Sequence, residues 1–200
     1  ASVAIAPGAS GYLPCDGRVG LPSEQARGAE VSTAVTDGDV LLVRLARFGT
    51  YVGNDFVPEP VIAALPDAFA EADAHAGVIL DLRGNPGGYA SVYMALASWL
   101  YPEPTVLFRC RPKSGLGHDD HGPAFAQTSA PDPSLQVSAP IAVLVDARSF
   151  SAADFTSMWV QATGRGVTVG APSGGGFGNG NGRADLVDGY FLGVNDILCE

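Results

Sequence analysis

The chain has 200 residues, a length that suits one domain with a buried hydrophobic core. Its formal net charge is −10 and no cluster of Lys and Arg stands out, which argues against a nucleic-acid partner. No apolar run reaches the ~18–20 residues of a membrane-spanning helix. Residues 1–11 lack the basic and apolar regions of an intact signal peptide. The classes that remain are globular enzymes and binding modules.

The first thirty residues are punctuated by Gly and Pro and follow no hydrophobic period, so we expect irregular or edge structure over 1–30. The pattern predicts a strand over 40–48 and then a loop over 49–58. Residues 60–74 are typical of an amphipathic helix, although Pro66 is unfavourable inside one. The apolar face of this helix consists of Val61, Leu65, Phe69 and Ala72.

Residues 78–82 are predicted to form the first central strand. Four of these five residues are aliphatic, as in a parallel strand that is buried on both faces. A helix over 90–100 and a strand over 105–111 follow. The inward face of that helix consists of Val92, Leu96, Trp99 and Leu100. Segment 112–140 is polar and contains several prolines, which predicts a long loop of the kind that is often functional or mobile.

Residues 141–145 are predicted to form the second central strand, and 151–163 the helix that follows it. The buried stripe of this helix consists of Ala152, Phe155, Trp159 and Ala162. A short strand over 167–169 precedes segment 170–182, which is too dense in glycine for a regular element. The last strand candidate is 190–194. Alternating strands and helices predict one α/β domain with a mainly parallel sheet over 31–200.

The chain has three cysteines, so at most one intramolecular disulfide forms. Cys110 lies in an apolar, strand-like run and is expected to be a buried thiol. The alternative is a disulfide between Cys15 and Cys199, near the two ends of the chain, which could form in an oxidising compartment. Spacing alone does not fix the connectivity.

Two segments carry the chemistry, and each is predicted to be a buried strand that ends in a sharp turn before a helix. The turn in 78–88 is rich in glycine, so its backbone N–H groups can face a ligand. The turn in 143–154 places Ser151 at a helix start, where free N–H groups favour developing negative charge. A nucleophile beside such a turn is the minimum equipment for acyl transfer. Because both turns follow strand ends of one sheet, we expect a single shared site.

Each residue of this predicted site also has a structural interpretation. Ser151 could be only an N-cap, and Ser149, its rival as nucleophile, suits an N-cap or turn better. The glycines could simply permit a tight turn. Asp81 and Arg83 are expected to be structural and to fix the first turn by charge-assisted hydrogen bonds.

The string Asp81-Leu-Arg-Gly-Asn-Pro-Gly-Gly88, followed by Ser149-Phe-Ser-Ala-Ala-Asp154, resembles the C-terminal processing peptidases, or tail-specific proteases. The resemblance covers roughly 40–182, and the tricorn core protease is a relative of this family. It implies a crotonase-like α/β fold with flanking helices, and it places the nucleophile on Ser151. The oxyanion hole is then expected from the N–H of Ala152 and that of Gly87 or Gly88.

The general base is where the chain departs from the family pattern. The processing peptidases use a Ser/Lys dyad, but Gly176 stands where the lysine is expected, and the single lysine is Lys113. In the tricorn-like branch a histidine supported by a glutamate serves the serine, and both would lie outside these 200 residues, making the chain a fragment of a longer one. Within the chain, His118 is the candidate base. The run His118-Asp-Asp-His121 is otherwise a metal site or a solvated loop, and we predict no metal and no cofactor.

Two main hypotheses follow. The first is a serine endopeptidase that cleaves peptides or protein C-terminal regions through a Ser151 acyl-enzyme, with a histidine as the base. Its partners would be peptides or unfolded chains docked as an added strand. The second is a non-catalytic relative that binds peptides or other ligands. An acyl-CoA enzyme rests on fold analogy alone. The resemblance also implies export to the periplasm, cell envelope or medium.

Overall fold

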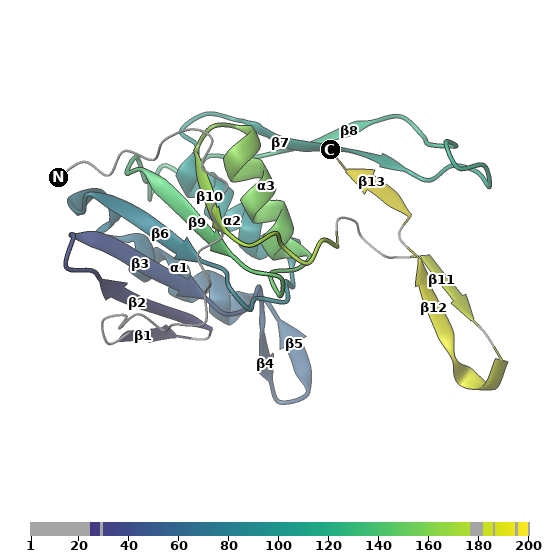
Figure 1. The fold of residues 1–200 in the computed structure, drawn as a ribbon, viewed down its shortest axis with the longest axis horizontal. Coiled ribbons are helices and arrows are strands. Elements are labelled where there is room, and N and C mark those ends of the chain that lie inside the picture. Colours follow the sequence, from purple (N-terminus) through teal and green to yellow (C-terminus); the bar gives the residue numbers. More distant parts are fainter. Residues whose placement is uncertain (1–24, 29, 177–181, 186, 195, 200) are drawn as a thin grey trace.

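A six-stranded sheet forms the centre of the computed structural model, which describes residues 25–28, 30–176, 182–185, 187–194 and 196–199 (Figure 1). Its strands are, in spatial order, β1 (Gln25–Gly28), β2 (Val31–Val35), β3 (Val40–Leu45), β6 (Gly77–Asp81), β9 (Ile141–Val145) and β10 (Gly166–Gly170). β2 pairs antiparallel with β1 and β3, whereas β3, β6, β9 and β10 are mutually parallel. The prediction of an α/β fold with a mostly parallel sheet is confirmed.

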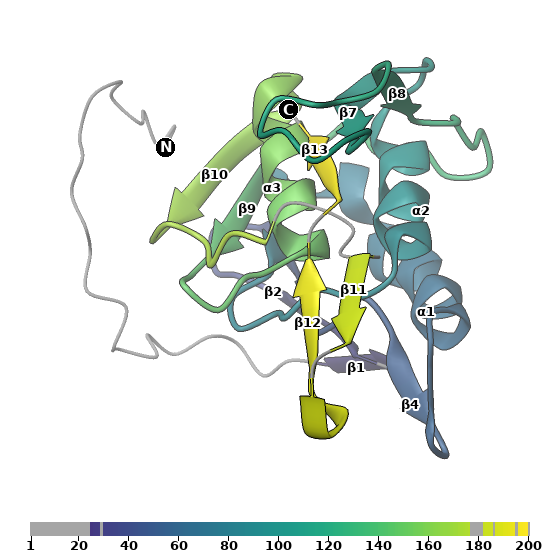
Figure 2. The same ribbon diagram turned by 90° about the vertical axis from the view of Figure 1, so that its right-hand side faces the viewer.

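Three helices pack against this sheet: α1 (Glu59–Phe69), α2 (Ala90–Leu100) and α3 (Ala152–Ala162). Consecutive helices contact each other, so they form one layer beside the sheet (Figure 2). The predicted inner faces of α1 and α2 are buried, and on α3 Ala152, Phe155 and Trp159 are buried as expected. Ala162 is exposed, because it lies in the last turn of α3, and Val160 is the buried residue there.

α1 is shorter than predicted. It ends at Phe69, and a separate 3₁₀ turn, Ala72–Ala74, completes the segment. Pro66 lies inside α1 without ending it. None of the helices in the described part of the chain is long and apolar enough to cross a membrane.

Two predicted loops contain strands. Segment 49–58 is a hairpin of β4 (Thr50–Val52) and β5 (Asp55–Val57), which projects from the body in Figure 1. Gly53 has a φ of +63° at its turn, which glycine adopts without strain. Segment 112–140 contains β8 (Phe125–Thr128), which pairs with β7 (Val106–Pro112).

The C-terminal region adds three strands. β11 (Gly182–Asp185) and β12 (Phe191–Val194) form a hairpin, and β13 (Ile197–Cys199) pairs antiparallel with β7. The N-terminal segment 1–30, predicted to be irregular or edge structure, contains the edge strand β1; residues 1–24 lie outside the described residues.

The disulfide expectation was wrong. Cys110 is buried but is not a free thiol, because it forms a disulfide with Cys199. The two cysteines lie directly opposite each other on β7 and β13. A Cys15–Cys199 bridge is therefore excluded, and Cys15 itself lies outside the described residues. The correct pair depends on β13, a strand that the sequence pattern does not predict.

Candidate active site

The two special turns meet at one end of the sheet. β6 and β9 are adjacent and parallel, so the chain leaves both strands at the same edge. The N–H of Phe150, in the second turn, donates to the carbonyl of Asn85, in the first, at 2.9 Å. A Cβ at Gly87 would lie only 2.7 Å from Ser151 Cβ. The structure thus brings together the serine and the glycine turn that the sequence indicates.

Ser151 immediately precedes α3 with a φ of +54° and a ψ of −116°. A positive φ is costly for a residue other than glycine and is a feature of functional sites. The side chain makes no N-cap hydrogen bond, and its hydroxyl has no partner among the described residues. The residue is only partly buried. A free hydroxyl on a strained strand-to-helix turn is the arrangement expected of a nucleophile rather than of an N-cap.

Ser149, the rival serine, has a structural role. It is fully buried. Its hydroxyl donates to the carbonyl of Leu82 at 2.8 Å and accepts the N–H of Asp146 at 2.9 Å. These bonds join the end of the first central strand to the second turn, so the Ser149 hydroxyl is already committed.

Two backbone N–H groups near Ser151 are free to bind an oxyanion. The N–H of Gly87 is not one of them, because it donates to Asn85 Oδ1 at 2.8 Å. Within the described ranges, the N–H groups of Gly88 and Ala152 have no partner. Of the three predicted donors, the structure therefore leaves Ala152 and Gly88. Asn85 is fully buried, and its Nδ2 donates to the carbonyl of Leu45 at 2.7 Å, which fixes the turn.

Glycine is required at both positions of the first turn. Gly88 has a φ of +140°, and a Cβ there would lie 2.4 Å from the carbonyl oxygen of Phe48. Gly87 has a φ of +94°, and a Cβ there would also lie 2.7 Å from the carbonyl oxygen of Phe150. The two glycines therefore allow the backbones of three segments to approach closely, in addition to shaping a turn.

Charged side chains hold both turns. Arg83 donates to the fully buried Asp81 through Nε at 2.8 Å and Nη2 at 2.7 Å, which confirms their predicted structural role. Asp146 bridges the turns, since its Oδ1 accepts the N–H groups of Gly84 and Arg148, each at 2.9 Å. Burial acts to raise the pKa of Asp146, but these hydrogen bonds hold it below its ordinary value. The role of Asp146 is not evident from the sequence, because its partner Gly84 is distant along the chain.

Asp154, one turn into α3, is almost completely buried at 1% exposure. Neither carboxyl oxygen has a well-formed hydrogen bond to the described residues. Burial raises its pKa, and the nearby Ser173 hydroxyl and the N–H groups of Ser151 and Gly175 only partly oppose this effect. Asp154 is thus a costly buried acid directly behind the serine turn.

The segment that would carry a family lysine lies against the same turn. The N–H of Gly174 donates to the carbonyl of Ser149 at 2.8 Å, and the N–H of Ser151 donates to the carbonyl of Gly175 at 3.4 Å. A Cβ at Gly176 would lie 2.5 Å from the ring of Phe150. The Phe150 ring therefore occupies the space that a side chain at position 176 would enter.

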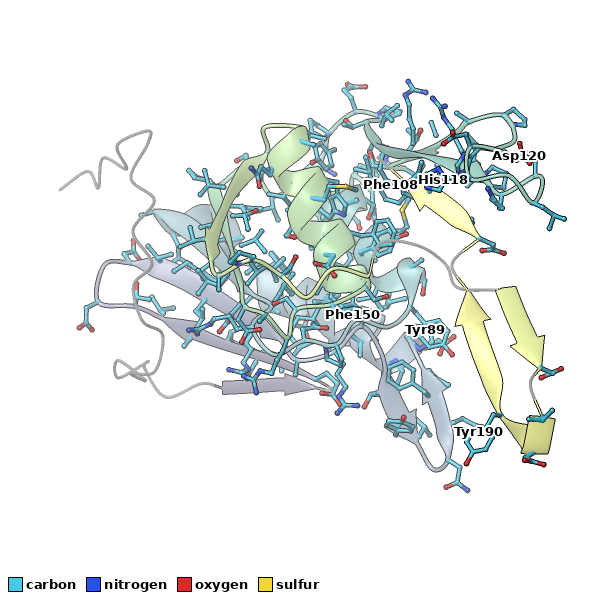
Figure 3. The ribbon with its side chains drawn as sticks, turned by 45° about the vertical axis from the view of Figure 1, so that its right-hand side comes forward. Tyr89, Phe108, His118, Asp120, Phe150 and Tyr190 are labelled. Carbon is cyan, nitrogen blue, oxygen red and sulfur yellow. A yellow bond between two sulfur atoms is a disulfide. The ribbon has the colours of Figure 1, made fainter. Side chains whose placement is uncertain are left out.

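The structure does not bring the other basic candidates to Ser151. His118 lies at the tip of the β7–β8 hairpin, and Figure 3 shows it well apart from Phe150. Its side chain is 98% exposed, and its Nδ1 is 2.8 Å from Asp119 Oδ1. Lys113 binds the backbone carbonyls of Gly117 and His118 in the same hairpin. In the described part of the chain, no cluster of His, Cys, Asp and Glu could hold a metal ion.

Residues 39–196 match the model of peptidase family S41. Three solved structures are similar to the chain. A peptidase candidate from Parabacteroides merdae is 21% identical, with a TM-score of 0.74 over 88% of this chain and 53% of that one. Mature CPAF complexed with lactacystin is 20% identical, with a TM-score of 0.67 over 95% and 50%. The photosystem II D1 C-terminal processing protease is 23% identical, with a TM-score of 0.55 over 90% and 42%.

These identities show a shared fold and nothing finer. The chain spans about half the length of the solved structures that it matches. A comparison with curated proteins finds no match.

Proposed function

Because this chain belongs to peptidase family S41, we propose that it carries the core of a serine endopeptidase that cleaves peptides or the C-terminal regions of proteins. One observation carries the proposal. The unbonded hydroxyl of Ser151 stands on a positive-φ turn, beside the free N–H groups of Gly88 and Ala152. A nucleophile and two oxyanion donors are thus held by one rigid network.

In the proposed reaction, Ser151 Oγ attacks the carbonyl carbon of a peptide bond and its proton passes to a general base. The N–H groups of Gly88 and Ala152 bind the oxyanion, each donor contributing about 3 kcal/mol in sites of this kind. The start of α3 adds the favourable end of a helix dipole. Collapse of the intermediate breaks the C–N bond, and the amine leaves with the proton from the base. Water then hydrolyses the Ser151 ester by the same route.

We propose a histidine as the base, supplied by a part of the protein beyond the described residues. Glycine stands at position 176, where the family has its lysine, and His118 is solvent-exposed in a separate hairpin. Two solved structures with this fold are about twice as long as this chain, which supports a further part of the protein that supplies the base. On this proposal residues 31–200 are one crotonase-like core within a longer protein, and 1–30 are a separate segment.

Two further features support the wider proposal. A disulfide between Cys110 and Cys199 fits an oxidising compartment, and therefore export to the periplasm, envelope or medium. The edge strand β10 leaves one side of the central sheet unpaired among the described residues, so an extended substrate chain could dock as an added strand.

The test is intact-mass measurement after incubation with a fluorophosphonate probe. On a version extended at both ends we expect one adduct, none when it carries Ser151→Ala, and full labelling when it carries Ser114→Ala, a matched exposed serine in the β7–β8 hairpin. Labelling only of a version extended at both ends would support an external base. Absence of labelling in that longer version would favour the alternative, a non-catalytic binding module, which the missing base among the described residues already motivates.

A further inference from the structure

Three aromatic rings contact one another in series beside the proposed site, and we name them the aromatic ladder: Tyr51 of β4, Phe56 of β5 and Tyr89 just before α2. The ring centroids of Tyr51 and Phe56 are 5.1 Å apart, and those of Phe56 and Tyr89 are 5.5 Å apart. Tyr89 also donates its hydroxyl hydrogen to the carbonyl of Phe56 at 2.6 Å. The ladder is therefore held in place before any ligand arrives.

The ladder is exposed although it is apolar. Tyr51 is 62% exposed and Tyr89 is 41% exposed, and the neighbouring Val52 is 56% exposed. Single exposed apolar residues are ordinary, but a contiguous group of fixed rings on a projecting hairpin is typical of an interaction surface. Aromatic rings suit this purpose, since they offer large contact areas with little conformational freedom to lose.

The ladder begins at the proposed oxyanion hole. Tyr89 directly follows Gly88, whose N–H is one of the two free donors, and its own N–H donates to the carbonyl of Phe48 at 2.7 Å. Phe150, which precedes Ser151, is 45% exposed and lies against Gly176. Figure 3 shows Tyr89 and Phe150 on the same part of the molecule, between α3 and the β4–β5 hairpin. A carbonyl bound at Gly88 and Ala152 would thus have an exposed ring on each side.

We propose that the aromatic ladder binds alternate apolar side chains of an extended polypeptide substrate whose scissile carbonyl lies at Ser151. This inference rests on the proposed peptidase function and names its substrate class. An extended chain rises about 3.3 Å per residue and presents every second side chain to one face. Alternate residues of such a chain are about 6.6 Å apart, slightly more than the single centroid steps of 5.1 and 5.5 Å, so two alternate side chains can each contact one of two neighbouring rings.

The position of the ladder favours a substrate over a permanent partner. A permanently bound partner that covered the rings from Tyr51 to Tyr89 would also block access to Gly88, which directly precedes Tyr89 in the chain. A substrate occupies the ladder only during turnover, and the ladder's position next to Gly88 would then guide its carbonyl to the proposed oxyanion hole. The exposed ring of Tyr51 is the farthest of the three from the serine turn along the ladder, so it can be removed without touching the proposed oxyanion hole.

The experiment measures binding in the Ser151→Ala background by fluorescence anisotropy, which needs no catalysis. Two labelled peptides differ only at two alternate positions, which hold Leu in one and Ser in the other. We expect the Leu peptide to bind at least about tenfold more tightly. Adding Tyr51→Ala should remove that preference, whereas Phe125→Ala, a ring 46% exposed on β8, should change it less than about twofold.

The outcomes separate the two proposals. Equal binding of the two peptides, or an equal effect of Tyr51→Ala and Phe125→Ala, would overturn the ladder proposal. So would a monomer-to-dimer shift in sedimentation that Tyr51→Ala abolishes, because the rings would then join two copies. Fluorophosphonate labelling without peptide discrimination would keep the peptidase and reject the ladder. Discrimination without any labelling of the version extended at both ends would keep the ladder as a peptide-binding surface and reject the catalytic proposal.

Discussion

The serine turn before α3 and the tip of the β7–β8 hairpin both gather reactive side chains, but they differ in what holds them. Around Ser151, groups from distant segments converge, including the buried Asn85 and Ser149 and the partly buried Asp146, and each has a long-range partner. At the hairpin tip, the side chains of His118 and Lys113 bond, among the described residues, only to those of their own hairpin. A run of chemically able residues makes a site only where the fold fixes it, because catalysis depends on preorganised geometry.

Glycine substitution is expected to separate these regions most sharply. Gly87→Ala would press a methyl group against backbone and Ser151 at 2.7 Å, in a residue with positive φ. We expect a loss of about 2–3 kcal/mol in the free energy of unfolding and labelling at least ~100-fold slower. Gly117→Ala in the hairpin would meet only the Asp120 side chain, which is exposed and can move. Urea titration measures the change in the free energy of unfolding, and the fluorophosphonate reaction measures the labelling rate. Equal effects of Gly87→Ala and Gly117→Ala would contradict the proposed difference between the two regions.

Removing the disulfide should destabilise the three-stranded sheet of β13, β7 and β8 and leave the serine turn intact. Cys110→Ser combined with Cys199→Ser removes the covalent link between residues 89 positions apart and leaves β13 held to β7 by backbone pairing. We expect a loss of about 2–5 kcal/mol in the free energy of unfolding. Because no hydrogen bond of the serine turn to the described residues involves β13, labelling of Ser151 below the unfolding transition should persist. Loss of labelling in the folded variant would show that the two regions are coupled.

Asp154, the buried acid behind the serine turn, should make the stability of the protein depend on pH, whereas the exposed acids of the hairpin should not. The folded-state pKa of Asp154 is raised, so the native state holds a proton that the unfolded chain loses near the ordinary value of 3.8. The free energy of unfolding should therefore fall as pH rises from that value through the folded pKa. Asp154→Asn should remove this slope and stabilise the protein at neutral pH by roughly 1–2 kcal/mol.

The matched control for that prediction is Asp119→Asn, since Asp119 lies in the hairpin with a 95% exposed side chain. It should leave the pH profile of thermal unfolding between pH 4 and pH 8 unchanged. A steeper slope in Asp154→Asn, or the same slope as the parent, would show that the carboxyl is paired and ionised in solution.

The same distinction explains what the sequence predicts. The strands β6 and β9, the helix α2 and the juxtaposed turns follow from local patterns of aliphatic residues and glycine. Asn85 and Asp146 were missed because their roles depend on partners about 40 and 60 residues away, such as Leu45 and Gly84. Such pairings exist only once the sheet order is known.

Two other misses have local causes. Gly53-Asn54 between Val52 and Asp55 is a hairpin turn signal that the loop assignment over 49–58 overlooked. The disulfide was mispaired because β13 is only three residues long, too short to show a period.

The smallest expected effect is that of His118→Ala, the substitution that tests the comparison most directly. The His118 ring is 98% exposed and contacts the neighbouring Asp119, so its loss should leave the melting temperature unchanged. If the base comes from elsewhere, the fluorophosphonate labelling rate should also change less than about twofold, far below the 10²–10⁴-fold that general-base catalysis contributes. A larger fall, reproduced by His118→Gln, would mean that the hairpin swings onto Ser151 when substrate binds. The exposed tip of the hairpin would then be the mobile half of the site, because the His118 side chain bonds only to the neighbouring Asp119 among the described residues of the free protein.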